Sequence, residues 1–150
     1  ARLDSGAKAE AMLREMWDKH RTNPNLEIKP DTRIYGGVIC AWAKSNVPHA
    51  GENAERLLEE MWQRYSEGDT SIAPNKFCYC SAIDAIGQNS NADCGEKAER
   101  LLQEALERQQ AHPTLDLKPD YMSYSGVIHA WAKSGDPGAI TRAARILEET

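Results

Sequence analysis

The fold of this chain is decided by a stretch that occurs twice, as YGGVICAWAKS at residues 35–45 and as YSGVIHAWAKS at residues 124–134. The match extends without a gap from residues 31–61 onto residues 120–150, and 17 of these 31 pairs are identical. Such self-similarity over a constant offset is the sequence signature of a repeat protein. We therefore read the rest of the chain as copies of one structural unit.

A second match gives the length of that unit. GENAERLLEE at residues 51–60 lies over GEKAERLLQE at residues 95–104, and eight of the ten positions are identical. The offset is 44 residues, which is also the distance from Asp31 to Asn75, while Asn75 to Asp120 spans 45. The sequence therefore repeats with a period of 44 to 45 residues.

Each period carries two sets of apolar residues at steps of three and four, the spacing that puts side chains on one face of an α-helix. In the first helix, which we call helix A, these sets are Tyr35, Val38, Ile39 and Trp42; Tyr79, Ala82, Ile83 and Ile86; and Tyr124, Val127, Ile128 and Trp131. In the second, helix B, they are Ala9, Met12, Leu13 and Met16; Ala54, Leu57, Leu58 and Met61; and Ala98, Leu101, Leu102 and Ala105. One helix pair cannot bury such faces alone, so the pairs must stack.

The junctions between units mark where each helix A begins. Lys-Pro-Asp at residues 29–31 and 118–120 and Ala-Pro-Asn at residues 73–75 place a helix-blocking proline before a residue that can cap the next helix. Helices are expected at about 5–21, 32–45, 51–66, 76–88, 95–110, 121–133 and 139–150. The sequence thus predicts an all-α solenoid of about seven helices in antiparallel pairs. Its units would be the end of one repeat (1–31), two whole repeats (32–75 and 76–120) and an incomplete one (121–150).

Composition and charge exclude some classes of function. The mean hydropathy of -0.65 and the absence of an apolar run near 18 residues exclude a membrane span. The net charge of -5 argues against a nonspecific polycationic nucleic-acid binder. It leaves room for a protein that is basic on one face, because the A helices lean basic and acidic residues collect on the B helices. The chain opens with Ala1 and closes on residues typical of a helix interior, so we expect a segment of a longer protein.

The cysteines do not indicate a metal or redox site. Cys40, Cys78, Cys80 and Cys94 form no CxxC pair, and we expect free thiols in a reducing compartment. A zinc site is rejected because Cys78 and Cys80, two apart on a helix, would point to different faces. The sequence also shows no phosphate-cradling glycine loop, no nucleophile with a base and no clustered carboxylates. We predict no catalytic residues, no metal and no cofactor.

Helix A carries a second stripe away from the packed one. Its members are Arg33, Gly36 and Cys40; Phe77, Cys80 and Asp84; and Met122, Ser125 and His129. The packed stripe nearly repeats, whereas this one differs in every copy. Recognition at one site per repeat would give this pattern, and so would the drift of exposed positions. Trp42 and Trp131 lie on the packed stripe and are expected in the core, while Trp17 and Trp62 are expected to pack between units.

These residues resemble the pentatricopeptide repeat family, over nearly the whole chain. The elements that carry the resemblance are Tyr-Gly-Gly-Val-Ile at residues 35–39, helix B ending in Glu-Glu-Met at residues 59–61, and the Lys-Pro-Asp junctions. The units are longer than is usual for the family, and elongated units of this kind are similar to those of algal members and of the repeat region of protein-only RNase P. The resemblance implies a right-handed α-α superhelix.

The resemblance also implies binding of single-stranded RNA with one base per repeat. It assigns base reading to Gly36 with Asn75, to Cys80 with Asp120, and to Ser125, whose partner would lie beyond Thr150. It assigns base sandwiching to Arg33, Phe77 and Met122, and phosphate contacts to Lys44 and Lys133, with Gln88 as the neutral exception. By analogy Asn75 favours adenine or cytosine, and Asp120 favours guanine or uracil. Gly36 and Cys80 depart from the usual Asn, Ser or Thr, which leaves Ser125 as the typical reading residue.

The expected function is therefore RNA binding in organellar RNA processing, stability, editing or translation, in a mitochondrion or plastid, with the compartment taken from the resemblance alone. The expected partner is single-stranded RNA, with other proteins as further partners and with neither a membrane nor a small-molecule substrate. Two alternatives stay open. One is a protein-binding scaffold of the tetratricopeptide kind, and the other is the RNA-binding region of a larger enzyme such as a protein-only RNase P.

Overall fold

The computed structural model describes residues 5–25, 27–45, 47–88, 93–134 and 138–148. Its helices are α1 (Ser5–Thr22), α2 (Thr32–Lys44), α3 (Ala50–Ser66), α4 (Lys76–Gly87), α5 (Cys94–Ala111), α6 (Tyr121–Ser134) and α7 (Ala139–Glu148), with a short 3-10 helix η1 (Thr70–Ile72). Six of them, α1 to α6, are described with all their side chains, and α7 with only part of its own. No β-strand occurs within the described ranges, which confirms the all-α prediction there.

Each A helix begins at the capping residue that the junctions predict. The carboxylate of Asp31 accepts a hydrogen bond from the N–H of Ile34 at 3.0 Å, and the amide oxygen of Asn75 accepts one from the N–H of Cys78 at 3.0 Å. Asp120 caps α6 in the same way. These bonds satisfy N–H groups that a helix start leaves without a partner. Every expected boundary of α1 to α6 lies within one residue of the observed one.

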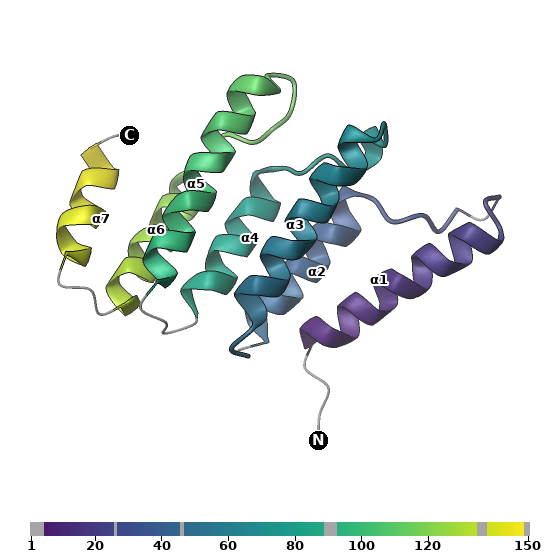
Figure 1. Cartoon of the computed structure of the whole chain (residues 1–150), viewed down its shortest axis with the longest axis horizontal. Coiled ribbons are helices and arrows are strands. Elements are labelled where there is room, and N and C mark those ends of the chain that lie inside the picture. Colours follow the sequence, from purple (N-terminus) through teal and green to yellow (C-terminus); the bar gives the residue numbers. More distant parts are fainter. Residues whose placement is uncertain (1–4, 26, 46, 89–92, 135–137, 149–150) are drawn as a thin grey trace.

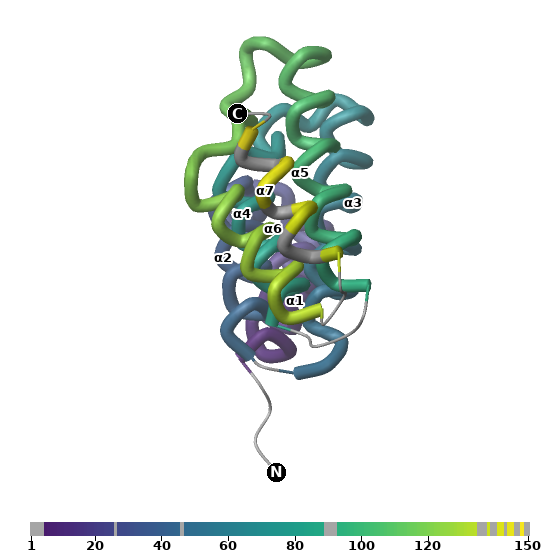
Figure 2. The backbone as a smooth tube through the Cα atoms, turned by 90° about the vertical axis from the view of Figure 1, so that its left-hand side faces the viewer, coloured from purple at the N-terminus to yellow at the C-terminus, as the bar shows by residue number. Residues whose placement is uncertain are grey.

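The helices follow one another side by side in chain order (Figure 1). The A helices α2, α4 and α6 pack in sequence against one another, and α3 packs against both α2 and α4, as α5 does against α4 and α6. Seen from the end of the row, α2 and α4 lie on one side and α3 and α5 on the other (Figure 2). The A and B helices therefore form two layers, with the apolar stripes facing one another between them.

The core consists of the stripes that the periodicity predicts. The stripe residues of α2, α3, α4 and α5 are all buried. Tyr124 and Ile128 of α6 are half-buried. The prediction fails at Met12, which is 67% exposed. The reason is that α3 packs against two A helices, whereas α1 packs against one A helix, α2, in the described part of the chain. None of the described helices combines the length and apolar character needed to cross a membrane.

Two tryptophans lie flat against glycines of the adjacent B helices. A Cβ atom added to Gly6 would lie 2.4 Å from the ring of Trp42, and one added to Gly95 would lie 2.4 Å from the ring of Trp131. The equivalent Gly51 faces Ile86, whose Cα would lie 3.0 Å from the added atom. Glycine at these places lets the helices approach closely enough to bury the indole rings.

Candidate nucleic-acid interface

The second stripe of the A helices forms one surface, which we call the open face. It consists of Arg33, Gly36, Cys40 and Lys44 of α2; Phe77, Cys80 and Asp84 of α4; and Met122, Ser125, His129 and Lys133 of α6. All of these residues except Gly36 are exposed or half-buried. Neighbours from three helices meet here, because the surroundings of Cys80 include Cys40 on α2 and Asp120 at the start of α6.

The three residues expected to sandwich bases occupy equivalent places in the first turns of these helices. Arg33, Phe77 and Met122 are all exposed, and Phe77 and Met122 each expose 52% of their surface. A large apolar side chain left in water at the same place in two adjacent units marks a candidate contact surface. Arginine and phenylalanine are planar groups on which a base can stack, and methionine can do so through dispersion.

The residues expected to read bases differ in their exposure to solvent. Gly36 is buried, because the ring of Phe77 lies over it: a Cβ added to Gly36 would be 3.2 Å from Phe77 Cδ2 and 3.5 Å from Cys78 Sγ. Cys80 is half-buried and Ser125 is exposed. A base edge therefore has direct access to Ser125, partial access to Cys80, and reaches Gly36 only if Phe77 moves.

Cys80 and Asp120, expected to act as a pair, are brought together. Burial raises the pKa of the Cys80 thiol, and the neighbouring Asp120 carboxylate raises it further, so the thiol stays protonated at neutral pH. Asp120 Oδ1 accepts hydrogen bonds from the N–H groups of Met122 and Ser123 at 3.1 and 3.3 Å. Its second carboxylate oxygen lies outside this cap. The pair can thus offer one strong acceptor and one weak donor to a base edge.

Charge on the two layers is distributed as the sequence predicts. Within α2 lie Arg33 and Lys44 with no acidic residue, and Lys133 is the charged residue of α6. In contrast, α3 carries four glutamates against two arginines. Lys44 and Lys133 are exposed in the last turns of their helices, where they also complement the helix dipole. The open face therefore carries more basic than acidic side chains, although the chain as a whole is acidic.

The tryptophans do not belong to this surface. Trp42 and Trp131 are 4% and 5% exposed, which confirms their place in the core. Trp17 and Trp62 pack between units as expected. Trp17 Nε1 donates to the hydroxyl of Tyr35 at 2.9 Å, and Trp62 Nε1 donates to the corresponding hydroxyl in the next unit at 2.7 Å.

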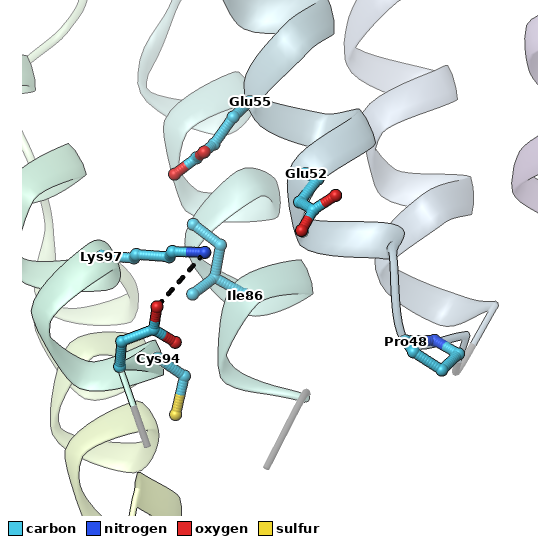
Figure 3. Close-up of a pocket in the computed structure, with 8 residues that line it drawn as sticks. Pro48, Glu52, Glu55, Ile86, Cys94 and Lys97 are labelled. Carbon is cyan, nitrogen blue, oxygen red and sulfur yellow. Dashed lines mark ion pairs between the residues drawn. The ribbon is translucent and has the colours of Figure 1, made fainter. Parts of the chain in front are cut away.

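A small pocket lies between α3, α4 and α5 (Figure 3). Glu55, Ile86, Cys94 and Lys97 line it, and Lys97 pairs with Asp93 at 3.5 Å. The Cys94 thiol donates to the carbonyl of Ala130 at 3.1 Å, and burial raises its pKa, so it is unsuited to act as a nucleophile. Among the described residues no group of His, Cys, Asp or Glu is arranged to hold a metal ion.

One exposed residue beside the open face was not anticipated from the sequence. Tyr121, the first residue of α6, is 75% exposed and precedes Met122. The equivalent residues are Thr32 and Lys76, both polar. The sequence did carry a signal, because the other units have polar residues at this place. The helical period, however, marks Tyr121 only as the start of a helix.

Comparisons with protein-family models, with curated proteins and with solved structures gave no significant match.

Proposed function

We propose that this chain is part of a right-handed superhelix of antiparallel helix pairs and that it binds single-stranded RNA along its open face. The observation that supports this most strongly is the exposure of Arg33, Phe77 and Met122 at the same place in three successive A helices. Phe77 and Met122 are two of the few large apolar side chains that the described residues leave exposed. Stacked bases would cover them, at about 1–3 kcal/mol per base.

In this proposal one base lies between Phe77 and Met122, and its edge faces Cys80 and Asp120. The neighbouring arrangement of Cys80 and Asp120 supports this choice of site. A carboxylate accepts hydrogen bonds, so Asp120 favours guanine and uracil, the two bases whose Watson–Crick edge carries a ring N–H donor. The base of the preceding unit would lie between Arg33 and Phe77 and face Gly36 and Asn75. Asn75 keeps its Nδ2 group outside the helix cap for this contact.

Lys44 and Lys133 bind the phosphates in this proposal, since both are exposed at the far ends of α2 and α6. The half-buried Gln88 stands between them in the series, so the middle unit contributes no charge at this place. On the resemblance of the sequence we assign the activity to organellar RNA processing, stability, editing or translation.

The direct experiment measures binding of a randomised, fluorescently labelled single-stranded RNA to the chain over a range of salt concentrations. We expect affinity to fall with salt, because RNA binding releases counterions from the phosphates. The double variant Lys44→Ala/Lys133→Ala should bind about tenfold more weakly and should lower the slope of log affinity against log salt by about 1.4, roughly 0.7 per lost contact.

A matched control carries the same change in charge elsewhere. Lys8→Ala/Lys19→Ala removes two exposed lysines from α1, outside the open face. It should leave the affinity and its salt dependence nearly unchanged. Equal losses in the two double variants would mean that RNA binds through nonspecific charge and not along the open face.

A further inference from the structure

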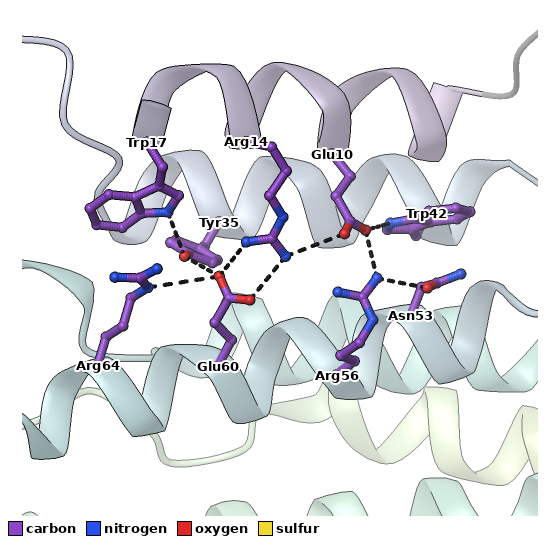
Figure 4. A network of polar contacts seen from close by, with 9 residues as sticks. All are labelled: Glu10, Arg14, Trp17, Tyr35, Trp42, Asn53, Arg56, Glu60 and Arg64. Atoms are coloured by element: carbon purple, nitrogen blue, oxygen red, sulfur yellow. Dashed lines mark hydrogen bonds and ion pairs between the residues drawn. The ribbon is translucent and has the colours of Figure 1, made fainter. Parts of the chain in front are cut away.

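The contact between α1 and α3, which we call the first seam, is closed by an arginine (Figure 4). Arg14 donates to both carboxylate oxygens of Glu60 at 2.9 Å, and donates a third hydrogen bond to Glu10 at 3.3 Å. Glu60 also accepts from the hydroxyl of Tyr35. Such two-pronged bonds between a guanidinium and a carboxylate are among the stronger polar contacts in proteins.

The contact between α3 and α5, the second seam, is built from the same residues shifted by one unit. The first seam contains Glu10, Arg14 and Trp17 of α1 with Arg56, Glu60 and Arg64 of α3, and the second contains Glu55, Glu59 and Trp62 of α3 with Arg100, Glu104 and Arg108 of α5. Five of the six positions carry the identical residue. The sixth reverses its charge, because Glu59 stands where the first seam has Arg14.

The second seam has a pocket beside Glu59, the residue that replaces Arg14. This pocket is lined by three carboxylates, two arginines and three apolar side chains, namely Glu55, Glu59, Glu104, Arg100, Arg108, Leu58, Trp62 and Leu101. Neither Glu55 nor Glu59 forms a hydrogen bond or an ion pair with any residue that the structure describes. Burial raises the pKa of Glu55, and the nearby Glu104 carboxylate raises it further. The positive charges of Lys97 and Arg100 lower it, but they do not cancel this increase.

One of the two arginines of the second seam keeps the place that its counterpart has in the first. Arg108 lies over the ring of Trp62 at 4.3 Å from its centre, as Arg64 lies over Trp17 at 3.8 Å. Arg100 corresponds to Arg56, which donates to Glu10 at 2.8 Å beside Arg14, but Arg100 forms no such bond with Glu55. The position between Glu55 and Glu104 is therefore the one that a missing guanidinium would complete.

We propose that the second seam binds the guanidinium group of an arginine side chain from a partner protein. The bound group would donate two hydrogen bonds to Glu104, as Arg14 does to Glu60, and a third to Glu55, with Glu59 as an additional acceptor. The planar guanidinium carries several N–H donors in fixed directions, so it suits this arrangement better than a lysine ammonium, which acts as a single point charge. The site lies on the B-helix layer, so it is independent of RNA binding on the open face.

The test titrates the chain with three probes: a short peptide containing one arginine, the same peptide with lysine, and free L-arginine, each followed by isothermal calorimetry and by amide chemical shifts. We expect the arginine peptide to bind and to shift resonances of α3 and α5, with the lysine peptide about tenfold weaker. Tighter binding of the peptide than of free L-arginine assigns the site to a protein partner, and equal binding assigns it to the free amino acid.

Substitutions at Glu59 locate the binding. Glu59→Arg supplies the missing guanidinium from the chain itself and should weaken binding of the arginine peptide by at least about tenfold. Glu59→Gln should weaken it less, which keeps the test valid if the arginine variant folds poorly. Glu107→Arg makes the same change of charge at an exposed site of α5 outside the pocket and should leave binding unchanged. Failure of the arginine peptide to bind, or equal binding to Glu59→Arg and the unmodified chain, would overturn the proposal.

Discussion

The first and second seams lie at equivalent places between B helices, but the pKa of the equivalent glutamate is lowered in the first and raised in the second. In the first, Glu10 accepts hydrogen bonds from Arg14, from Arg56 and from the indole N–H of Trp42. Burial acts to raise the pKa of Glu10, but these bonds outweigh it and leave the pKa below its ordinary value. In the second, the equivalent Glu55 has a raised pKa.

Two substitutions between repeats account for this contrast. Glu59 replaces Arg14, and Ile86 replaces Trp42, so the second seam lacks two of the three donors that hold Glu10. In the third member of the series Trp131 Nε1 donates to Glu99 at 3.0 Å, and Arg142 donates to the same carboxylate at 3.0 Å. The donors that a glutamate finds at this place therefore depend on which side chains the neighbouring helices supply.

The largest effect on stability is expected when Trp42 is replaced by isoleucine, the residue at the equivalent place in the second seam. Trp42→Ile should lower the free energy of unfolding by about 3 kcal/mol, because it leaves a cavity and removes the N–H donor of Glu10. Ile86→Val removes one methyl group at the equivalent place and should lower the free energy of unfolding by about 1 kcal/mol. Urea unfolding followed by circular dichroism measures both, and equal costs would mean that the indole contributes no more than the isoleucine.

A somewhat smaller effect is expected at the glycines beneath these side chains. Gly95→Ala should destabilise the protein by about 2 kcal/mol, since the new methyl group would overlap the ring of Trp131. Gly51→Ala should cost about 1 kcal/mol, because the contact with Ile86 is less severe. Thermal unfolding of the two variants side by side tests this order, and a reversed order would contradict the close approach at Gly95.

Removing the charge of Glu60 should break the first seam in a pH-dependent way. Burial acts to raise the pKa of Glu60, but hydrogen bonds from Arg14 and Tyr35 outweigh it and lower the pKa. A lowered pKa in the folded state contributes stability above the unfolded value, which is lost as the pH falls through the folded one. Glu60→Gln should thus cost about 1–2 kcal/mol at pH 7, and the difference should shrink below about pH 4.

The smallest effect, and the opposite sign, is expected at Glu55. Its raised pKa means that stability present below the unfolded value is lost as the pH rises through the folded one. Glu55→Gln should therefore stabilise the protein at pH 7 by less than about 1 kcal/mol, with no gain below about pH 4. Unfolding curves at pH 4 and pH 7 test this, and a loss of stability at pH 7 would show that Glu55 is held by a donor.

The repeat made the boundaries of α1 to α6 predictable to within one residue. Tyr35, Val38 and Ile39 recur with the helical period, and a proline followed by Asp or Asn marks each start, so propensity and packing indicate the same boundaries. The helix η1 was missed because three residues carry no period. It is held by contacts with distant residues, such as the ion pair of Lys29 with Asp69 at 2.6 Å.

The site was less predictable than the fold, because its geometry depends on side chains of neighbouring units. The sequence placed Gly36 on the open stripe, but only the packing of α4 against α2 shows that Phe77 covers it. The second seam was also missed, although aligning Arg14 with Glu59 would have revealed the charge reversal. That alignment becomes informative only once α1, α3 and α5 are known to lie in one layer.

The most direct test of the proposed RNA site is amide hydrogen exchange of the chain with and without single-stranded RNA. We predict slower exchange in the first turns of α2, α4 and α6, around Arg33, Phe77 and Met122, with α3 and α5 unchanged. Protection centred on α3 and α5, or no protection at an RNA concentration that saturates binding, would contradict an RNA site on the open face.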